Sequence, residues 1–472
     1  MPFDVPSHSH AVTQEMDITA YKPSAHPRSE RPSRESRPPS PKTFTYDLTR
    51  KGKTWGTLTL LGDPALSRST PTFVEPGVEE GREGARVRGS VALSLESSEV
   101  IHSVKVTVRG QLSIGASAPF TFLDASATPW SRELGDPRAG ALPGIWSGKL
   151  RGAYSWPFDI QLPRTVTLPV GSPPRERRYA LPVNFWERHE PVRVRYHVVL
   201  HVLRGTFKGD LRLPVEIAYV PRSAPPPASP ARRLAYEERR SIPPPESDVD
   251  GWYTPRSVVA SGVIAGHHEV EVTCSLFLAK PVNDVTSYIS DSLTPSINFS
   301  FFQSQLCYTR GSVIPCTLVL ESHDIAALDL LSSPTAPAAR LRRRLRYKSN
   351  IGRLLDDDDG DTGWQDSTIV YDLASWWPRE GAPQHAYRRC LDGEIHLKED
   401  LRPTTTFAHW RVEYEVVLFP FDVLSFVGRE RDPLVIQSVE IAATYGPGPR
   451  PRAFTAPAYE FAGHMPVLSG SY

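Results

Sequence analysis

The sequence predicts an all-β protein built from two tandem antiparallel β-sandwiches, with disordered tails at both ends. Between residues 192 and 202 apolar and polar side chains alternate with one exception, which is strand periodicity rather than helical periodicity. Prolines bound this segment and its neighbours, and proline lacks the N–H that a central strand donates. Proline also accounts for 47 of 472 residues, about twice ordinary usage. The composition therefore favours short strands and loops over long helices.

The chain is too long for one ordinary core, since a domain takes roughly 100–200 residues. Its N-terminal stretch is rich in Ser, Pro and Arg and has too few aliphatic residues to offset the entropy of ordering. Composition changes along the chain predict five parts: a disordered Ser/Pro/Arg-rich arm (1–42), an N-terminal β-sandwich (43–221), a Pro-rich linker (222–250), a C-terminal β-sandwich (251–445) and a flexible tail (446–472).

Runs of alternating residues, broken by turn residues, predict the strands of each sandwich. In the first half they cover 44–48, 55–61, 86–96, 101–112, 154–163, 192–204 and 211–221. In the second half they cover 257–264, 269–278, 298–308, 312–321, 340–347, 390–397, 409–419 and 434–444. Short strands at such spacing are typical of sandwiches.

The charge balance excludes a global electrostatic field, because 54 Lys and Arg face 53 Asp and Glu. We therefore expect no nucleic-acid partner, and any anion binding must come from a local patch. The four cysteines have no CxxC spacing and lie in apolar runs, which favours buried reduced thiols over disulfides or a zinc site. The start of the chain lacks the pattern of a secretory signal, and no apolar run approaches the roughly 20 residues of a membrane span. These features predict a cytoplasmic protein.

The order of several motifs resembles the arrestin family, in particular fungal arrestin-like proteins related to the α-arrestins. The motifs are Gly89 within an alternating strand, the Ile-x-x-Val-x-Val-x-Val-x-Gly run at 101–110, the Tyr-Ser-Trp-Pro-Phe-Asp-Ile-x-Leu-Pro run at 154–163, Val194-x-Tyr196, and the Cys-Tyr-Thr-Arg-Gly-Ser-Val-Ile-Pro-Cys run that begins at Cys307. The resemblance covers roughly residues 43–445.

The resemblance implies two immunoglobulin-like, arrestin-like sandwiches held side by side in a non-catalytic adaptor or scaffold. Such a protein links cytosolic tails of membrane-protein cargo to machinery for endocytosis, protein transport, signalling or ubiquitination, at the plasma membrane or endosome. We also expect no cofactor and no metal, because no histidine grouping has a second pair of ligands at a recognised spacing. α-Arrestins usually recruit a HECT-type ubiquitin ligase through Pro-Pro-x-Tyr, and this chain has no such tetrapeptide. Its nearest equivalent contains Pro457 and Tyr459, which we expect to be a degenerate ligand for a WW domain.

An arginine run in the second half is the strongest candidate binding site. Strand spacing places four arginines on one face (Arg340, Arg342, Arg344 and Arg346), with Leu341, Leu345 and Tyr347 on the other and Arg343 toward a rim. A row of guanidinium groups suits phosphate, in a phosphorylated tail or an anionic lipid. The alternative interpretation is a solvated strand face whose charge is offset by the four aspartates at 356–359.

Other patterns give weaker hypotheses. Ser40 precedes a proline in the basic arm and is a candidate phosphorylation site for a proline-directed kinase. The acidic run at 356–361 lacks a carboxylate at the first position of an EF-hand loop, so no metal site is expected there. No catalytic motif was found. The alternative function is that of a β-sandwich protein that binds carbohydrate or a cell surface.

Overall fold

β-Strands make up most of the secondary structure in the computed structural model, which confirms the all-β prediction. The structure describes residues 40–50, 52–76, 84–138, 148–170, 175–205, 208–254, 256–282, 306–348, 363–381 and 385–455. In these ranges the helices are short: α1 (Pro230–Glu238), α2 (Ile325–Leu331) and the 3-10 turns η2 (Arg132–Leu134) and η3 (Val249–Gly251). None of them is long and apolar enough to cross a membrane.

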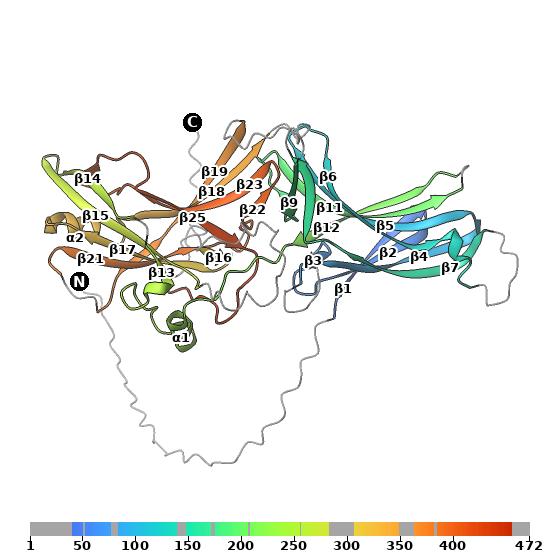
Figure 1. Cartoon of the computed structure of the whole chain (residues 1–472), viewed down its shortest axis with the longest axis horizontal. Helices are drawn as coiled ribbons and strands as arrows, with labels where there is room; N and C mark the ends of the chain where they lie inside the picture. Colours follow the sequence, from blue (N-terminus) through green and yellow to red (C-terminus); the bar gives the residue numbers. More distant parts are fainter. Residues whose placement is uncertain are drawn as a thin grey trace, which may run out of the picture. The chain divides into compact units, whose positions relative to one another are not determined.

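The N-terminal sandwich consists of two main sheets and a ribbon, drawn in blue to green in Figure 1. One sheet contains, in order, β1 (Lys42–Arg50), β2 (Lys53–Gly62), β4 (Arg86–Glu99) and β7 (Leu150–Gln161). The other contains, in order, β3 (Thr72–Val74), β12 (Leu211–Val220), β11 (Val192–Arg204), β5 (Ile101–Ile114) and β6 (Phe120–Ser131), with β10 (Phe185–Trp186) paired to β11. The ribbon is formed by β8 (Thr165–Val170) and β9 (Arg175–Ala180).

The C-terminal sandwich also has two sheets. One contains, in order, β20 (Ser375–Pro378), β21 (Arg388–His396), β17 (Val313–Glu321), β15 (His268–Ala279), β14 (Val258–Ile264) and β24 (Phe426–Gly428), with β13 (Trp252–Tyr253) paired to β15. The other contains, in order, β16 (Cys307–Thr309), β25 (Val435–Ala442), β23 (Trp410–Phe419), β18 (Ala338–Lys348) and β19 (Trp364–Leu373), with β22 (Thr405–Phe407) paired to β23. The four cysteines of the chain are free, as expected, and three of them are buried in this half.

The two sandwiches share one strand order. The sheet β3-β12-β11-β5-β6 corresponds to β16-β25-β23-β18-β19, and the sheet β1-β2-β4-β7 corresponds to β14-β15-β17-β21. In each half one short strand, β3 or β16, pairs in parallel with the last strand of that half, β12 or β25, while the remaining strand pairs described are antiparallel. The described chain therefore repeats one topology twice.

The alternation seen in the sequence determines which side chains form the core. Along β11 the six alternating apolar residues from Val192 to Val202 are at most 1% exposed, and Val199, the exception, lies on the opposite face. Gly89 on β4 meets a different constraint, because a Cβ there would lie 2.0 Å from the carbonyl oxygen of Thr59 and 2.8 Å from the ring of Phe158. The motif glycine is thus required by close strand packing.

A buried tyrosine fixes the same corner in each half. Tyr196 on β11 donates its hydroxyl to the carbonyl of Pro182 at 2.7 Å, and Tyr414 on β23 donates to the carbonyl of Arg402, also at 2.7 Å. β11 and β23 are equivalent strands, so the repeat extends to single side chains. Burial raises the pKa of both tyrosines, which keeps each hydroxyl protonated as a donor.

Glu99 closes one end of the N-terminal sandwich. Its carboxylate is 4% exposed at the end of β4 and forms ion pairs with Arg204 at the end of β11 (3.0 Å), with Lys208 (2.8 Å) and with Arg50 (3.2 Å). β4 and β11 belong to opposite sheets, so this cluster joins the two layers. Burial would raise the pKa of Glu99, but hydrogen bonds from Lys208 and Arg204 outweigh it and lower the pKa to about 2.

We predict that Glu99→Gln destabilises the protein by about 3 kcal/mol at pH 7, the free energy that corresponds to lowering a pKa from 4.5 to about 2. Because the folded-state pKa is depressed, this contribution is fully present above the unfolded pKa. It should disappear as the pH falls from about 4.5 to about 2. Urea unfolding of the wild type and the variant at several pH values measures how this difference in the free energy of unfolding changes. Glu96→Gln is the matched control, since its ion pair with Lys53 is exposed and worth little. Equal effects of the two substitutions would contradict the prediction.

Candidate functional site

Strand β18 carries the arginine run and has two distinct faces. Arg340, Arg342, Arg344 and Arg346 alternate with buried residues, as the sequence spacing predicts. The buried face contains Ala339, Leu341, Arg343 and Leu345, each no more than 3% exposed. β18 is an inner strand, paired with β19 on one side and β23 on the other, so the outward arginines have neighbours on both flanks.

The outward arginines are paired with carboxylates of the flanking strands. Arg342 binds Glu415 of β23 at 2.7 Å, while Arg344 and Arg346 share Asp366 of β19 at 2.5 and 2.9 Å. Arg340 donates to the carbonyl of Tyr371 at 3.3 Å. The offsetting charge thus includes residues that sequence reasoning did not single out. The aspartates at 356–359, which we expected to supply it, lie outside the described residues.

The shared carboxylate of Asp366 is held in its ionised form. Burial would raise the pKa of Asp366, but the hydrogen bonds from Arg344 and Arg346 outweigh it and lower the pKa. At the end of the same face, three cations approach the ring of Trp364 on β19: Arg411 at 4.7 Å, Lys348 at 5.4 Å and Arg346 at 5.5 Å from the centroid. Each is within the range of a cation–π interaction. This end of the face concentrates positive charge around one aromatic ring.

Arg343 points to the other side of β18 and reaches the N-terminal sandwich. Its guanidinium forms two hydrogen bonds of 2.7 Å to the two oxygens of Glu187, directly after β10, and lies 3.8 Å from Glu190. Arg343 is 3% exposed. Burial would lower its pKa, but the hydrogen bonds to Glu187 outweigh burial and raise it. A bidentate, charge-assisted pair of this kind is both strong and geometrically specific.

Further contacts between the sandwiches surround this ion pair. Ser367 on β19 donates to Glu190 at 2.6 Å, and the Nε of Arg402 lies 3.8 Å from Glu187. We call the set of Arg343, Glu187, Glu190 and Ser367 the junction pair cluster. It joins β18 and β19 of one sandwich to the short loop that precedes β11 in the other.

An aromatic cluster lies beside the polar contacts. Phe407 on β22 packs against Phe122 on β6 and Tyr179 on β9, with ring centroids 4.9 and 5.6 Å apart. Trp410 on β23 packs against Phe185 on β10 at 5.1 Å. Phe185, Phe407 and Trp410 are completely buried. The two sandwiches therefore meet through apolar packing as well as through the ion pair.

Sequence reasoning found β18 but placed Arg343 at a rim. The sequence does contain a sign that Arg343 is buried. Along β18 it is the one arginine that takes a place where the polar and apolar alternation calls for an apolar residue. Its partners had no comparable signal, since Glu187 and Glu190 stand in a short charged loop that resembles many solvated loops. Only the fold brings residues 156 positions apart into contact.

The segment expected to be a linker is docked on the C-terminal sandwich. Helix α1 begins after Ser229, whose side chain accepts from the N–H of Arg232, and has Pro230 in its first turn. Buried Arg232 donates to the carbonyls of Lys280 (3.1 Å) and Gly251 and packs over the ring of Trp252. From the sequence we expect this segment to pack along the outside of the sandwiches through Leu234 and Tyr236. Tyr236 is buried as predicted, whereas Leu234 is 53% exposed, so the prediction for Leu234 is wrong.

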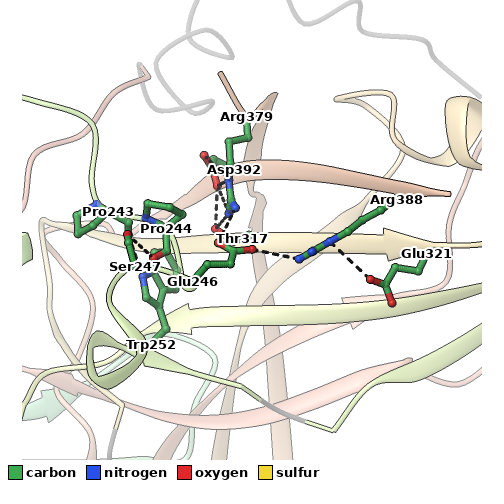
Figure 2. A network of polar contacts seen from close by, with 10 residues as sticks. All are labelled: Pro243, Pro244, Glu246, Ser247, Trp252, Thr317, Glu321, Arg379, Arg388 and Asp392. Atoms are coloured by element: carbon green, nitrogen blue, oxygen red, sulfur yellow. Dashed lines mark hydrogen bonds and ion pairs between the residues drawn. The ribbon is translucent and has the colours of Figure 1, made fainter. Parts of the chain in front are cut away.

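A polar network holds the end of this segment, as Figure 2 shows. Glu246 pairs with Arg379 at 3.0 Å and with Arg388 at 3.1 Å. Arg379 also contacts Asp392 on β21 (2.9 Å) and Thr317 on β17 (3.1 Å), so Glu246 is tied to two strands of one sheet. The indole of Trp252 donates to the carbonyl of Pro243 at 3.0 Å. Residues 222–250 are therefore part of the C-terminal sandwich surface.

The remaining candidates are Ser40, Pro457 and Tyr459. Ser40 is exposed immediately before β1, which leaves its hydroxyl accessible to a kinase. Pro457 and Tyr459 lie outside the described residues. No model of a known protein family matches the chain, and no curated protein is significantly similar to it. The functional argument therefore rests on the geometry.

We predict that Arg343→Met destabilises the protein by about 3–5 kcal/mol, because it leaves Glu187 and Glu190 without their buried partner. Arg344→Met is the matched control on the same strand. Its ion pair is about one-third exposed, so its loss should cost about 0–1 kcal/mol. Unfolding in guanidinium chloride, monitored by tryptophan fluorescence, measures the free energy of unfolding of both variants. A cost for Arg343→Met no larger than that of the control would show that the junction pair cluster does not hold the sandwiches together.

Proposed function

We propose that this protein is a non-catalytic adaptor that binds an anionic segment in the cytosolic tail of a membrane protein and links that cargo to trafficking or ubiquitination machinery. The observation that carries the proposal is the double role of β18. One face of the strand joins the two sandwiches through Arg343, and the other presents Arg340, Arg342, Arg344 and Arg346 in a row.

The outward face has the chemistry for an anionic ligand. Arg342, Arg344 and Arg346 contact the carboxylates of Glu415 and Asp366 through guanidinium groups rich in N–H donors. A phosphorylated serine or threonine carries close to two negative charges and three acceptor oxygens. It can therefore compete with a single carboxylate for two neighbouring guanidinium groups. Trp364, with its three cations, extends the same face.

A scaffold also needs the two sandwiches held in a constant arrangement. Buried aromatic residues and a bidentate ion pair support this requirement, because both are specific in geometry. We also propose that the protein recruits a HECT-type ubiquitin ligase through Pro457 and Tyr459. On this proposal it acts at the plasma membrane or the endosome.

We predict that replacing Arg340, Arg342, Arg344 and Arg346 by Ser weakens binding of a doubly phosphorylated tail peptide by at least about tenfold, since charge-assisted hydrogen bonds contribute about 1.5–3 kcal/mol each. Isothermal titration calorimetry measures the affinity. The matched control replaces four exposed arginines of the N-terminal sandwich by Ser: Arg178, Arg193, Arg195 and Arg212. It removes the same charge and should leave binding within about twofold at 0.15 M salt.

A second variant should act in the opposite direction. Glu415→Gln with Asp366→Asn removes the competing carboxylates and should strengthen phosphopeptide binding. Binding of the protein to liposomes with and without anionic lipid is measured in parallel. This comparison distinguishes a peptide ligand from a membrane ligand. Unchanged peptide binding by the quadruple variant, with its fold intact by circular dichroism, would contradict the proposed site.

The scaffold geometry has its own test. We predict that a protease site inserted between Arg222 and Ser223 can be cut without separating the sandwiches, because residues from Ser223 onward stay with the C-terminal half through Ala443 and Thr444. In the described part of the chain, the junction pair cluster and the aromatic contacts around Phe407 and Trp410 then join the two pieces. They should co-elute in gel filtration, and should separate when the cut protein also carries Arg343→Met. Separation of the cut wild-type pieces would refute a fixed arrangement.

A further inference from the structure

Residues 446–455, which the sequence places in a flexible tail, lie against the C-terminal sandwich. The hydroxyl of Tyr445 donates to the carbonyl of Gly311 at 3.1 Å, and the guanidinium of Arg450 stacks over the Tyr445 ring at 4.4 Å. Phe454 contacts Trp377 of β20, with ring centroids 6.3 Å apart. The segment therefore has specific contacts at both ends.

A single buried carboxylate anchors the end of this segment. Glu394 on β21 is 1% exposed and accepts hydrogen bonds from the backbone N–H of Phe454 (3.0 Å), from the N–H of Thr455 (2.7 Å) and from the Thr455 hydroxyl. His396 places its Nε2 3.1 Å from both the Glu394 carboxylate and the Thr455 hydroxyl. All of these partners are donors or can donate, so the carboxylate is the acceptor at the centre of the anchor.

The anchor depends on Glu394 being ionised. Burial would raise the pKa of Glu394, but hydrogen bonds from His396, Thr455 and the two backbone N–H groups outweigh it and lower the pKa. The Thr455 hydroxyl is thus held against the negative charge of a buried carboxylate. Any additional negative charge on that oxygen would be strongly unfavourable there.

The sequence around Thr455 matches the substrate pattern of arginine-directed protein kinases. Arg450 and Arg452 stand five and three positions before the threonine, in Arg450-Pro-Arg452-Ala-Phe-Thr455. Both arginines are exposed and accessible to an acidic substrate groove. The acceptor hydroxyl itself contacts Glu394 in the docked segment, so a kinase must capture it when the segment lifts off.

We propose that Thr455 is a phosphorylation site for an arginine-directed kinase and that its phosphorylation releases residues 446–455 from the C-terminal sandwich. The kinase transfers the γ-phosphoryl group of ATP to the Thr455 oxygen: the bond between the γ-phosphorus and the bridging oxygen of ADP breaks, the new O–P bond forms, and the hydroxyl proton is lost. This inference goes beyond the adaptor role and does not depend on it.

Phosphorylation removes the docked state for two reasons. The hydroxyl that donated to Glu394 no longer has a proton, and the phosphate would occupy the space that the carboxylate fills. The phosphate also brings close to two negative charges against that carboxylate, which is more than the single imidazole of His396 can offset. The modified segment therefore cannot re-dock, and the equilibrium shifts to the released form.

The experiment uses the full-length protein with ATP and the purified catalytic domain of a kinase of the protein kinase B type. Mass spectrometry locates the phosphate, and trypsin cleavage after Arg452 measures release. We expect phosphate on Thr455 and cleavage at least about tenfold faster, since two like charges in contact cost more than a factor of ten. Phosphatase treatment should restore slow cleavage. Thr455→Glu should be cleaved faster than the unmodified protein without any kinase.

Thr455→Val is the control, because it preserves the shape of the side chain but accepts no phosphate. Kinase and ATP should leave its cleavage rate unchanged. A rate increase in this variant would assign release to another modified residue and overturn the proposal. Lack of phosphate on Thr455 in the full-length protein would refute the site, and phosphorylated protein cleaved at the unmodified rate would refute the release.

Discussion

The buried pair between Arg343 and Glu187 is the interaction on which the relation between the two sandwiches depends. An arginine side chain keeps its charge at any pH at which proteins fold, so Arg343 cannot become neutral when it is buried. It must either contact a carboxylate or return to water. Because Arg343 is 3% exposed on the core face of β18, returning to water requires the sandwiches to separate. The ion pair thus favours the associated arrangement of the sandwiches, and the aromatic contacts around Phe407 reinforce it.

The repeated topology gives the two sandwiches one common framework. β5 and β18 are equivalent strands, as are β11 and β23, and the buried tyrosines Tyr196 and Tyr414 mark the same corner in each half. The repeat supplies two stable frameworks, and a few side chains then distinguish them. Glu99 closes the N-terminal sandwich with an internal charge cluster, whereas Arg343 directs the C-terminal sandwich toward its neighbour.

Much of the fold could be predicted from the sequence, because period-two alternation and proline punctuation report local structure. The strand at 192–204 and the two faces of the arginine run follow from that pattern alone. The partners Glu187, Glu415 and Asp366 could not be identified, since their roles arise from strand pairing between distant residues. For the segment at 222–250 the burial of Tyr236 could be predicted, whereas the burial of Arg232 and the ion pair of Glu246 with Arg379 depend on contacts between distant residues.

The junction between the sandwiches also has a consequence for protein synthesis. The N-terminal sandwich is complete at the end of β12, Val220, but Phe407 and Trp410, which cover its aromatic face, are made roughly 190 residues later. At a synthesis rate of about 5–20 residues per second, the nascent sandwich exposes Phe122, Phe185 and an unpaired Glu187 for about 10–40 s. During that interval the first sandwich exposes an apolar patch to solvent. The patch is covered once Phe407 and Trp410 have been synthesised and the second sandwich has folded against the first.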